Sequence, residues 1–170
     1  MTASLDPSDP ATHSHRDAAL AALMRGVPYI GFLGITVDRH GDELTLILPY
    51  QEKLLGNPDV PALHGGVTAA FLEITAIIEL SWSLLWAGPA EALPQAHRTP
   101  PSETLPRLPK TIDFSVDYLR LGVPRDAYAR ARVNRSGRRY ASVRVEAWQT
   151  HRRRLFAQST VHFRMPPRQR

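Results

Sequence analysis

After a polar start, apolar residues recur at helical spacing in one segment and alternate or cluster in the segments that follow. Residues 1–15 show no apolar period, so we expect a flexible N-terminal tail. Residues 16–25 carry apolar side chains three and four positions apart until Gly26 and Pro28 interrupt the pattern, which predicts a short amphipathic helix. Residues 32–38 and 43–49 are apolar, β-branched runs joined by a glycine-containing turn, which predicts the first pair of strands.

The segment 65–87 is almost continuously apolar and long enough for about six helical turns. As a membrane span it would place Glu73 and Glu79 in hydrocarbon, at a cost of about 2–3 kcal/mol for each charge near the centre. We therefore expect a helix that is buried inside the protein, beginning at Gly65 and Gly66 and ending before Gly88.

Six of the fifteen prolines lie in residues 88–109, which sets this stretch apart as an insertion or lid loop. Four strand-like stretches follow, 110–121, 127–135, 139–150 and 155–164, and the short turns between them predict an antiparallel meander. We expect an α+β arrangement, in which a curved antiparallel sheet of five to six strands wraps around one long central helix. Residues 16–165 form this single domain, between the tail 1–15 and a C-terminal tail 166–170.

Charge is distributed unevenly along the chain. Residues 1–119 hold 7 basic and 14 acidic side chains, whereas residues 120–170 hold 14 arginines and 2 acids. The planar guanidinium group binds phosphate through paired hydrogen bonds, so the basic part favours a phosphate-bearing ligand. We do not expect nucleic acid as a partner, because the aromatic residues among these arginines, Tyr128, Tyr140 and Trp148, are sparse and follow the strand pattern.

The chain has no cysteine, which excludes disulfides, zinc–thiolate sites and thiol nucleophiles. His13 and His15 lie in the polar tail, and we expect them to be solvated rather than metal ligands. No P-loop, dinucleotide fingerprint or Gly-x-Ser-x-Gly sequence occurs, so we expect neither a cofactor nor a metal ion. Residues 1–14 lack the basic and apolar runs of a targeting signal, so we expect a cytoplasmic protein with no membrane partner.

The sequence becomes specific at His64-Gly65-Gly66, which is followed by Glu73 nine residues after the histidine. Two glycines at a helix start allow a ligand to approach the backbone, and the free N–H groups there favour a developing negative oxygen. Glu73 lies a little over two turns into a helix that otherwise excludes charge, so it is a candidate base. Two simpler interpretations stay open: the glycines form only a tight helix start, and the glutamate serves an interface or a core hydrogen bond.

Together with the order of elements, residues 63–67 and Glu73 resemble the hotdog-fold acyl-CoA thioesterases of the PaaI-like type. Residues 111–120 are similar to the family's second diagnostic strand, and residues 137–148 and 156–159 to its last two strands. The similarity covers about residues 28–165 without the proline-rich insertion.

The resemblance implies a hydrolase that cleaves an acyl-CoA thioester to a free acid and CoA. The Gly65 N–H would hold the carbonyl oxygen, and Glu73 would activate water or attack the carbonyl carbon directly. Family members take the glycine and the carboxylate from different subunits, so a homodimer or a dimer of dimers is implied. Asn57 resembles the family's amide that orients the carbonyl, although it stands one residue too far from His64, which is expected to fix the turn by hydrogen bonding.

The resemblance also implies substrate-binding residues, which are Thr111, Gly66, Arg120, Arg138 and Arg139. The three arginines lie near strand ends, where family members meet the CoA phosphates. Ile77 departs from the family, because relatives with a glutamate have Ser or Thr one helical turn later to hold the water. Thr111 lies where some relatives carry a serine and is the other source of that hydroxyl.

Two other functions fit the same fold. A hotdog module that binds an acyl-CoA or a protein partner without hydrolysis is favoured by Ile77 and by the displaced Asn57. A dehydratase would need an aspartate and a histidine near the helix start, and only His64 is in place. The acyl group stays open, because the apolar helix and the proline-rich loop suit either a medium chain or an aryl acid.

Overall fold

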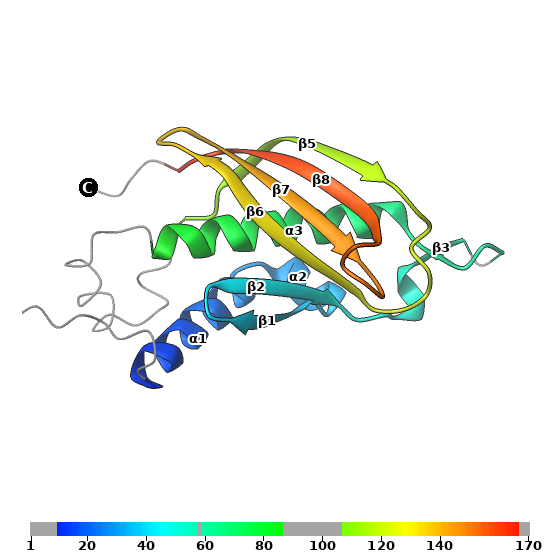
Figure 1. Cartoon of the computed structure of the whole chain (residues 1–170), viewed down its shortest axis with the longest axis horizontal. Coiled ribbons are helices and arrows are strands. Elements are labelled where there is room, and N and C mark those ends of the chain that lie inside the picture. The colour runs from blue at the N-terminus through cyan, green and yellow to red at the C-terminus, as the bar shows by residue number, and fades with distance from the viewer. Residues whose placement is uncertain (1–9, 58, 87–106, 167–170) are drawn as a thin grey trace, which may run out of the picture.

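The computed structural model describes residues 10–57, 59–86 and 107–166 of the chain (Figure 1). The helices are α1 Pro10–Arg25, α2 Pro28–Leu33 and α3 Gly65–Leu85, with a 3-10 turn, η1, at Glu52–Leu54. The strands are β1 Thr36–His40, β2 Glu43–Leu48, β3 Leu55–Asn57, β4 Ala62–Leu63, β5 Lys110–Tyr118, β6 Ala127–Ser136, β7 Tyr140–Trp148 and β8 Leu155–Arg164.

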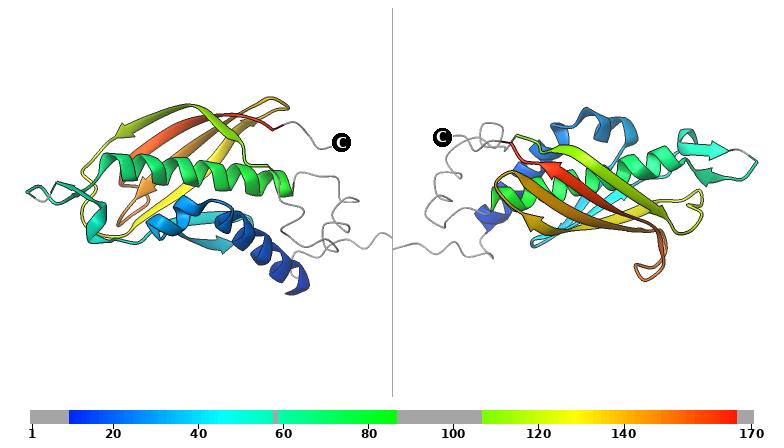
Figure 2. Two further views of the ribbon diagram at one scale, coloured as in Figure 1. Left: turned by 180° about the vertical axis from the view of Figure 1, so that it is seen from behind. Right: turned by 90° about the horizontal axis from the view of Figure 1, so that it is seen from above.

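Six of these strands form one antiparallel sheet in the order β1-β2-β6-β7-β8-β5, and β3 and β4 form a separate small hairpin. The sheet curves over α3, while α1 and α2 lie on the same side as the β1–β2 hairpin (Figures 1 and 2). The predicted α+β fold, a curved antiparallel sheet around one long central helix, is therefore confirmed.

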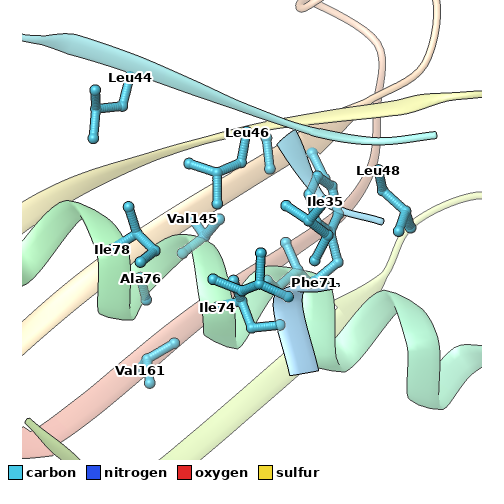
Figure 3. Close-up of a cluster of buried hydrophobic side chains, with 14 of the residues drawn as sticks. Ile35, Leu44, Leu46, Leu48, Phe71, Ile74, Ala76, Ile78, Val145 and Val161 are labelled. Atoms are coloured by element: carbon cyan, nitrogen blue, oxygen red, sulfur yellow. The ribbon is translucent and has the colours of Figure 1, made fainter. Parts of the chain in front are cut away.

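α3 forms the core because apolar side chains cover most of its surface. Its apolar residues with no accessible surface are Phe71, Leu72, Ala76, Ile78 and Leu80. They meet side chains of the sheet such as Leu46, Val145 and Val161, which are equally buried (Figure 3). Burying one large apolar side chain contributes about 1.5–3 kcal/mol, so this contact dominates the stability of the fold. α3 is long and apolar enough to cross a membrane, and its place under the sheet accounts for that composition.

α1 begins at Pro10 rather than at residue 16, so part of the predicted tail is helical. No apolar period marks these residues because polar contacts hold the helix in place. The Arg16 guanidinium lies 4.6 Å from the ring centroid of Trp86 and 2.7 Å from the Asp42 carboxylate. A cation–π contact and an ion pair thus hold α1 in place, and neither leaves a helical spacing of apolar residues in the sequence.

The expectation that His13 and His15 are both solvated holds for only one of them. His13 is exposed on α1. His15 packs edge-on against Trp86, with 6.1 Å between the ring centroids. The second histidine therefore belongs to the contact between α1 and the end of α3.

A second helix, α2, precedes the first strand, so the strand predicted from residue 32 begins at Thr36. Pro28 stands in the first turn of α2, where its missing N–H costs nothing. Gly34 ends the helix in the left-handed conformation, with φ of 71°. The prediction missed α2 because six residues are too few to show a helical period.

The predicted four-strand meander is wrong for its first strand. β5 pairs with β8 at the edge of the sheet, whereas β6, β7 and β8 follow one another as expected. The connection 119–126 crosses the start of β8, where the Leu119 and Arg120 N–H groups both donate to the Phe156 carbonyl. Alternation fixes which face of a strand is buried, but not which strand it pairs with, so this crossing could not be predicted.

Several predicted boundaries cannot be compared with the structure. Residues 87–106, with most of the predicted insertion 88–109, and residues 167–170 of the C-terminal tail lie outside the described residues. α3 ends at Leu85, two residues before the predicted end.

Candidate active site

His64 caps the start of α3. Its Nδ1 accepts a hydrogen bond of 2.9 Å from the Gly66 N–H, and its own N–H donates to the Leu54 carbonyl at 2.8 Å. Gly56 of β3 lies against it so closely that a Cβ at Gly56 would stand 3.0 Å from the His64 Cα. The expected hydrogen-bonding role of His64 in fixing this turn is therefore confirmed.

The peptide group between Gly65 and Gly66 is held at both ends. Its carbonyl accepts a hydrogen bond of 2.8 Å from the Tyr118 hydroxyl, while its N–H donates to His64. The preceding N–H, that of Gly65, has no acceptor among the residues that the structure describes. The Gly65 N–H lies at the N-terminus of a 21-residue helix, which is the positive end of the helix dipole. It can therefore donate a hydrogen bond to a negatively charged oxygen.

Tyr118 is a residue of this site to which the sequence analysis gave no role. It is the last residue of β5, and its ring lies 3.6 Å from the position that a Cβ would take at Gly65. The predicted strand contained Tyr118, but the strand pattern says nothing of where its hydroxyl reaches. Only the crossing of β5 to the edge beside β8 brings the end of this strand to the start of α3.

Glu73 lies on a partly open face of α3. Between Phe71 and Trp82, the residues that are not buried are Glu73, Ile77 and Glu79. Glu73 and Ile77 stand one turn apart on the same face. The Glu73 carboxylate is half-buried, and no described residue donates a hydrogen bond to it or forms an ion pair with it. It is thus an acceptor without a partner in the part of the chain that the structure describes.

Glu73 and Gly65 do not meet within one chain. Eight residues separate them on α3, which corresponds to about 12 Å along the helix axis. A carbonyl group between a hydrogen-bond donor and an attacking group needs about 3 Å on each side. The predicted pair can therefore act on one carbonyl group only if the two residues come from different copies of the chain.

The described carboxylate with a clearly perturbed pKa is Glu79. Its pKa is raised from 4.5 to about 7, first by burial and in addition by the nearby carboxylates of Asp42 and Glu43. Glu79 lies 14 residues along α3 from Gly65, about 21 Å away, so it belongs to a different region. The sequence analysis used Glu79 only as an argument against a membrane span, although a lone charge on an apolar helix was the available signal.

Three other predicted site residues, Asn57, Thr111 and Gly66, form no hydrogen bond with Glu73 among the described contacts. The Asn57 side chain is exposed and accepts a hydrogen bond of 2.9 Å from the Asp59 N–H, within the β3–β4 hairpin. Thr111 is half-buried on β5, beside a bulge at which Ile112 has no partner on β8. Gly66 is exposed, and its N–H is occupied by His64.

The three predicted arginines divide between the two ends of the sheet. Arg120 follows β5 at the end where Tyr118 meets Gly65, and its guanidinium donates to the Leu155 carbonyl. Arg138 and Arg139 lie in the β6–β7 turn at the other end, beside the start of β5 and the end of β8 (Figure 1). Within one chain only Arg120 lies close to the start of α3.

Comparisons with known proteins support the fold. The model of the thioesterase superfamily matches residues 61–156, which include the start of α3 and most of the sheet. The medium/long-chain acyl-CoA thioesterase YigI of Escherichia coli (strain K12) is 32% identical over 124 residues, covering 71% of this chain and 74% of that protein.

Solved structures show the same fold. A protein from Shewanella oneidensis related to the thioesterase superfamily superposes with a TM-score of 0.67 at 26% identity, covering 94% of this chain and all (100%) of that chain. A protein from Chromobacterium violaceum has a TM-score of 0.61 at 28% identity and covers 92% of this chain and 96% of that chain. The resemblance to hotdog-fold thioesterases read from the sequence is confirmed by these matches.

We predict that Gly66→Ala and His64→Ala destabilise the protein through one shared contact. A Cβ at Gly66 would stand 3.0 Å from the His64 Nδ1 and push the ring out of its cap. Each substitution should lower the free energy of unfolding by about 1 kcal/mol, and the double variant by no more than the worse single one. Urea unfolding of the three variants checks this, with Gly65→Ala as the control, because a Cβ there makes only ordinary contacts. Additive losses would contradict the shared cap.

We predict that Glu79 makes the protein less stable as pH rises from about 5 to 8. Its pKa is raised in the folded state, so the folded protein binds more protons than the unfolded chain over this interval, and deprotonation costs stability. Glu79→Gln should equal the wild type near pH 5 and exceed it near pH 8 by roughly 2 kcal/mol. Urea unfolding across this range measures the difference, with the exposed Glu52→Gln as the control. Parallel pH profiles for wild type and Glu79→Gln would show that this carboxylate is not responsible.

Proposed function

This chain belongs to the thioesterase superfamily and is a thioester hydrolase, and on that premise we propose that it cleaves acyl-CoA to a free acid and CoA at a site shared by two copies. The observation that carries the proposal is the Gly65 N–H, which finds no acceptor among the described residues at the start of a buried helix, while the next peptide group is held at both ends. The relative named as a medium/long-chain acyl-CoA thioesterase supports acyl-CoA as the substrate.

Gly65 supplies the oxyanion donor in this proposal. When the thioester carbonyl is attacked, its oxygen gains negative charge and accepts a hydrogen bond from the Gly65 N–H. His64 and Tyr118 keep the adjoining peptide group in place, so the donor needs no rearrangement during the reaction. Removing a comparable donor in other enzymes costs about 10²–10³ in kcat.

Glu73 comes from the second copy. Two observations support a pair of chains: the 12 Å that separate Gly65 and Glu73 along one helix, estimated from about 1.5 Å per residue, and the open edge of the sheet. β5 is an edge strand of nine residues with Ile112 58% exposed, and the chain beyond it exposes Leu121 by 57%. An edge strand of nine residues presents N–H and C=O groups that favour pairing with another strand. A homodimer covers this edge.

Two routes lead from this arrangement to products. In the first, Glu73 takes a proton from water, the water oxygen attacks the carbonyl carbon, and the carbon–sulfur bond breaks to release the CoA thiolate, which is then protonated. In the second, a Glu73 oxygen attacks the carbonyl carbon and expels the thiolate, and water hydrolyses the resulting anhydride. Ile77 has no hydroxyl that could hold the attacking water beside Glu73. The first route therefore needs a hydroxyl from another residue, for which Thr111 is the candidate.

The acyl group lies against the partly open face of α3. Ala70 and Ile77 flank Glu73 on this face, and Leu84 continues it two turns later, all of them half-buried and apolar. An unbranched chain of medium or greater length matches such a stripe. The name of the 32% identical relative supports the same class of substrate.

We predict that substituting either Glu73 or Gly65 alone is enough to lower the rate of thioester hydrolysis. Purified wild-type protein should release free thiol from octanoyl-CoA in an assay with a thiol reagent. Glu73→Gln should lower kcat by about 10²–10⁴, and Gly65→Pro by about 10²–10³. Proline is tolerated in the first helical position, and the extended His64 backbone (φ −58°, ψ 133°) suits a residue before proline, so this variant removes the N–H and leaves the helix in place.

Matched controls separate chemistry from folding. Gly65→Ala keeps the N–H, and Glu79→Gln removes the other half-buried carboxylate of α3, so both should retain kcat within a few fold. The proposal fails if wild type and Glu73→Gln release thiol equally slowly from every acyl-CoA tested. Saturable binding of acyl-CoA without release of thiol would indicate a binding module instead.

A further inference from the structure

A hollow of about 220 Å³ opens at the end of the sheet where α3 begins. The connection from β5 to β6, residues 119–126, forms one wall, and the turn from β7 to β8, residues 149–154, forms the other. Three arginines line it, Arg120, Arg125 and Arg154, together with the Thr150 side chain and the buried ring of Phe156. We call it the arginine hollow.

The walls of the arginine hollow are held together by one side chain. The Gln149 Oε1 accepts from the Val123 N–H at 2.9 Å, and its Nε2 donates to the carbonyls of Val123 at 2.8 Å and Arg125 at 3.1 Å. Arg120 is fixed in addition by its bond to the Leu155 carbonyl. The hollow is thus a built feature of the fold, because both loops are braced against each other.

The charge in the hollow is uncompensated. No acidic side chain lines it, and none of its three arginines forms an ion pair with a described residue. The arginines that do pair with a carboxylate elsewhere are Arg16, Arg39, Arg130 and Arg144. Asp126, the acid of the same connection, accepts from the Tyr50 N–H at 2.7 Å. Three guanidinium groups around one hollow match a ligand with several phosphate oxygens.

The hollow lies beside the candidate active site. The Leu63 N–H donates to the Gly122 carbonyl at 2.7 Å, which joins the hollow's wall to β4. Leu63 is two residues from Gly65, at most about 7 Å of extended chain. One ligand can therefore place a reacting group at Gly65 and an anionic group among these arginines.

We propose that the arginine hollow binds the phosphate groups of the CoA part of the substrate. This inference rests on the proposed function and adds Arg125 and Arg154 to Arg120, whereas Arg138 and Arg139 of the same chain lie at the opposite end of the sheet. The hollow sets affinity for the CoA part and takes no part in bond breaking. Its arginines contribute equally before and during the reaction, so their loss raises KM and leaves kcat unchanged.

The test compares substrates with and without phosphate. The double variant Arg125→Gln/Arg154→Gln should raise KM for octanoyl-CoA by about tenfold or more with kcat within twofold of wild type. Its kcat/KM for octanoyl-pantetheine, which has the same thioester and no phosphate, should equal that of wild type. Arg153→Gln is the matched control, because it removes one charge from the same turn without lining the hollow. An equal loss on both substrates would overturn the inference.

Direct binding separates this inference from the proposed function. Calorimetric titration with CoA should show at least about tenfold weaker binding to the double variant, and inorganic pyrophosphate should compete with CoA for the wild type. If the wild type binds CoA more tightly than the double variant does but hydrolyses no acyl-CoA, the inference about the arginine hollow is supported and the proposed function fails. If hydrolysis occurs and the double variant binds CoA as tightly as wild type, the function stands and the hollow is refuted. Pyrophosphate binding that does not compete with CoA refutes it as well.

Discussion

The burial of one apolar helix inside a curved sheet is the constraint on which the molecule depends. α3 supplies the side chains that fill the sheet's concave face, and its fully buried residues leave almost no freedom in its position. Everything at its two ends and along its partly open face is placed by that packing. The start of the helix becomes a fixed donor, because His64 and Tyr118 hold the peptide group beside it. Glu73 stands on the partly open face of α3 as an acceptor to which no described residue donates a hydrogen bond.

In the proposed function each chain supplies half of a site. Gly65 and Glu73 stand eight positions apart on one straight helix, so the proposal takes the donor and the carboxylate that act on one carbonyl group from different copies. The exposed edge strand β5 ends at Tyr118, which touches the donor's peptide group. Pairing of copies along this edge would therefore couple assembly directly to the geometry of the active site.

The sequence predicted the parts that follow from periodicity and missed those that depend on polar contacts and strand neighbours. The buried helix from Gly65, the strands after residue 110 and the capping role of His64 could be read directly, because each leaves a local pattern. The start of α1 at Pro10 and the place of β5 beside β8 could not, since an arginine over a tryptophan and a crossing connection leave none. Tyr118 was missed for the second reason, whereas Glu79 could have been singled out, because burial on an apolar helix is the main cause of its raised pKa.

The central claim is that Gly65 of one chain works with Glu73 of another, and complementation between two inactive chains tests it most directly. Chains carrying Gly65→Pro and chains carrying Glu73→Ala, unfolded together and refolded as a mixture, should form mixed dimers in which one of the two sites is intact. With random pairing, about a quarter of the wild-type activity should return, although neither variant is active alone. A mixture that forms dimers and stays inactive would contradict the shared site.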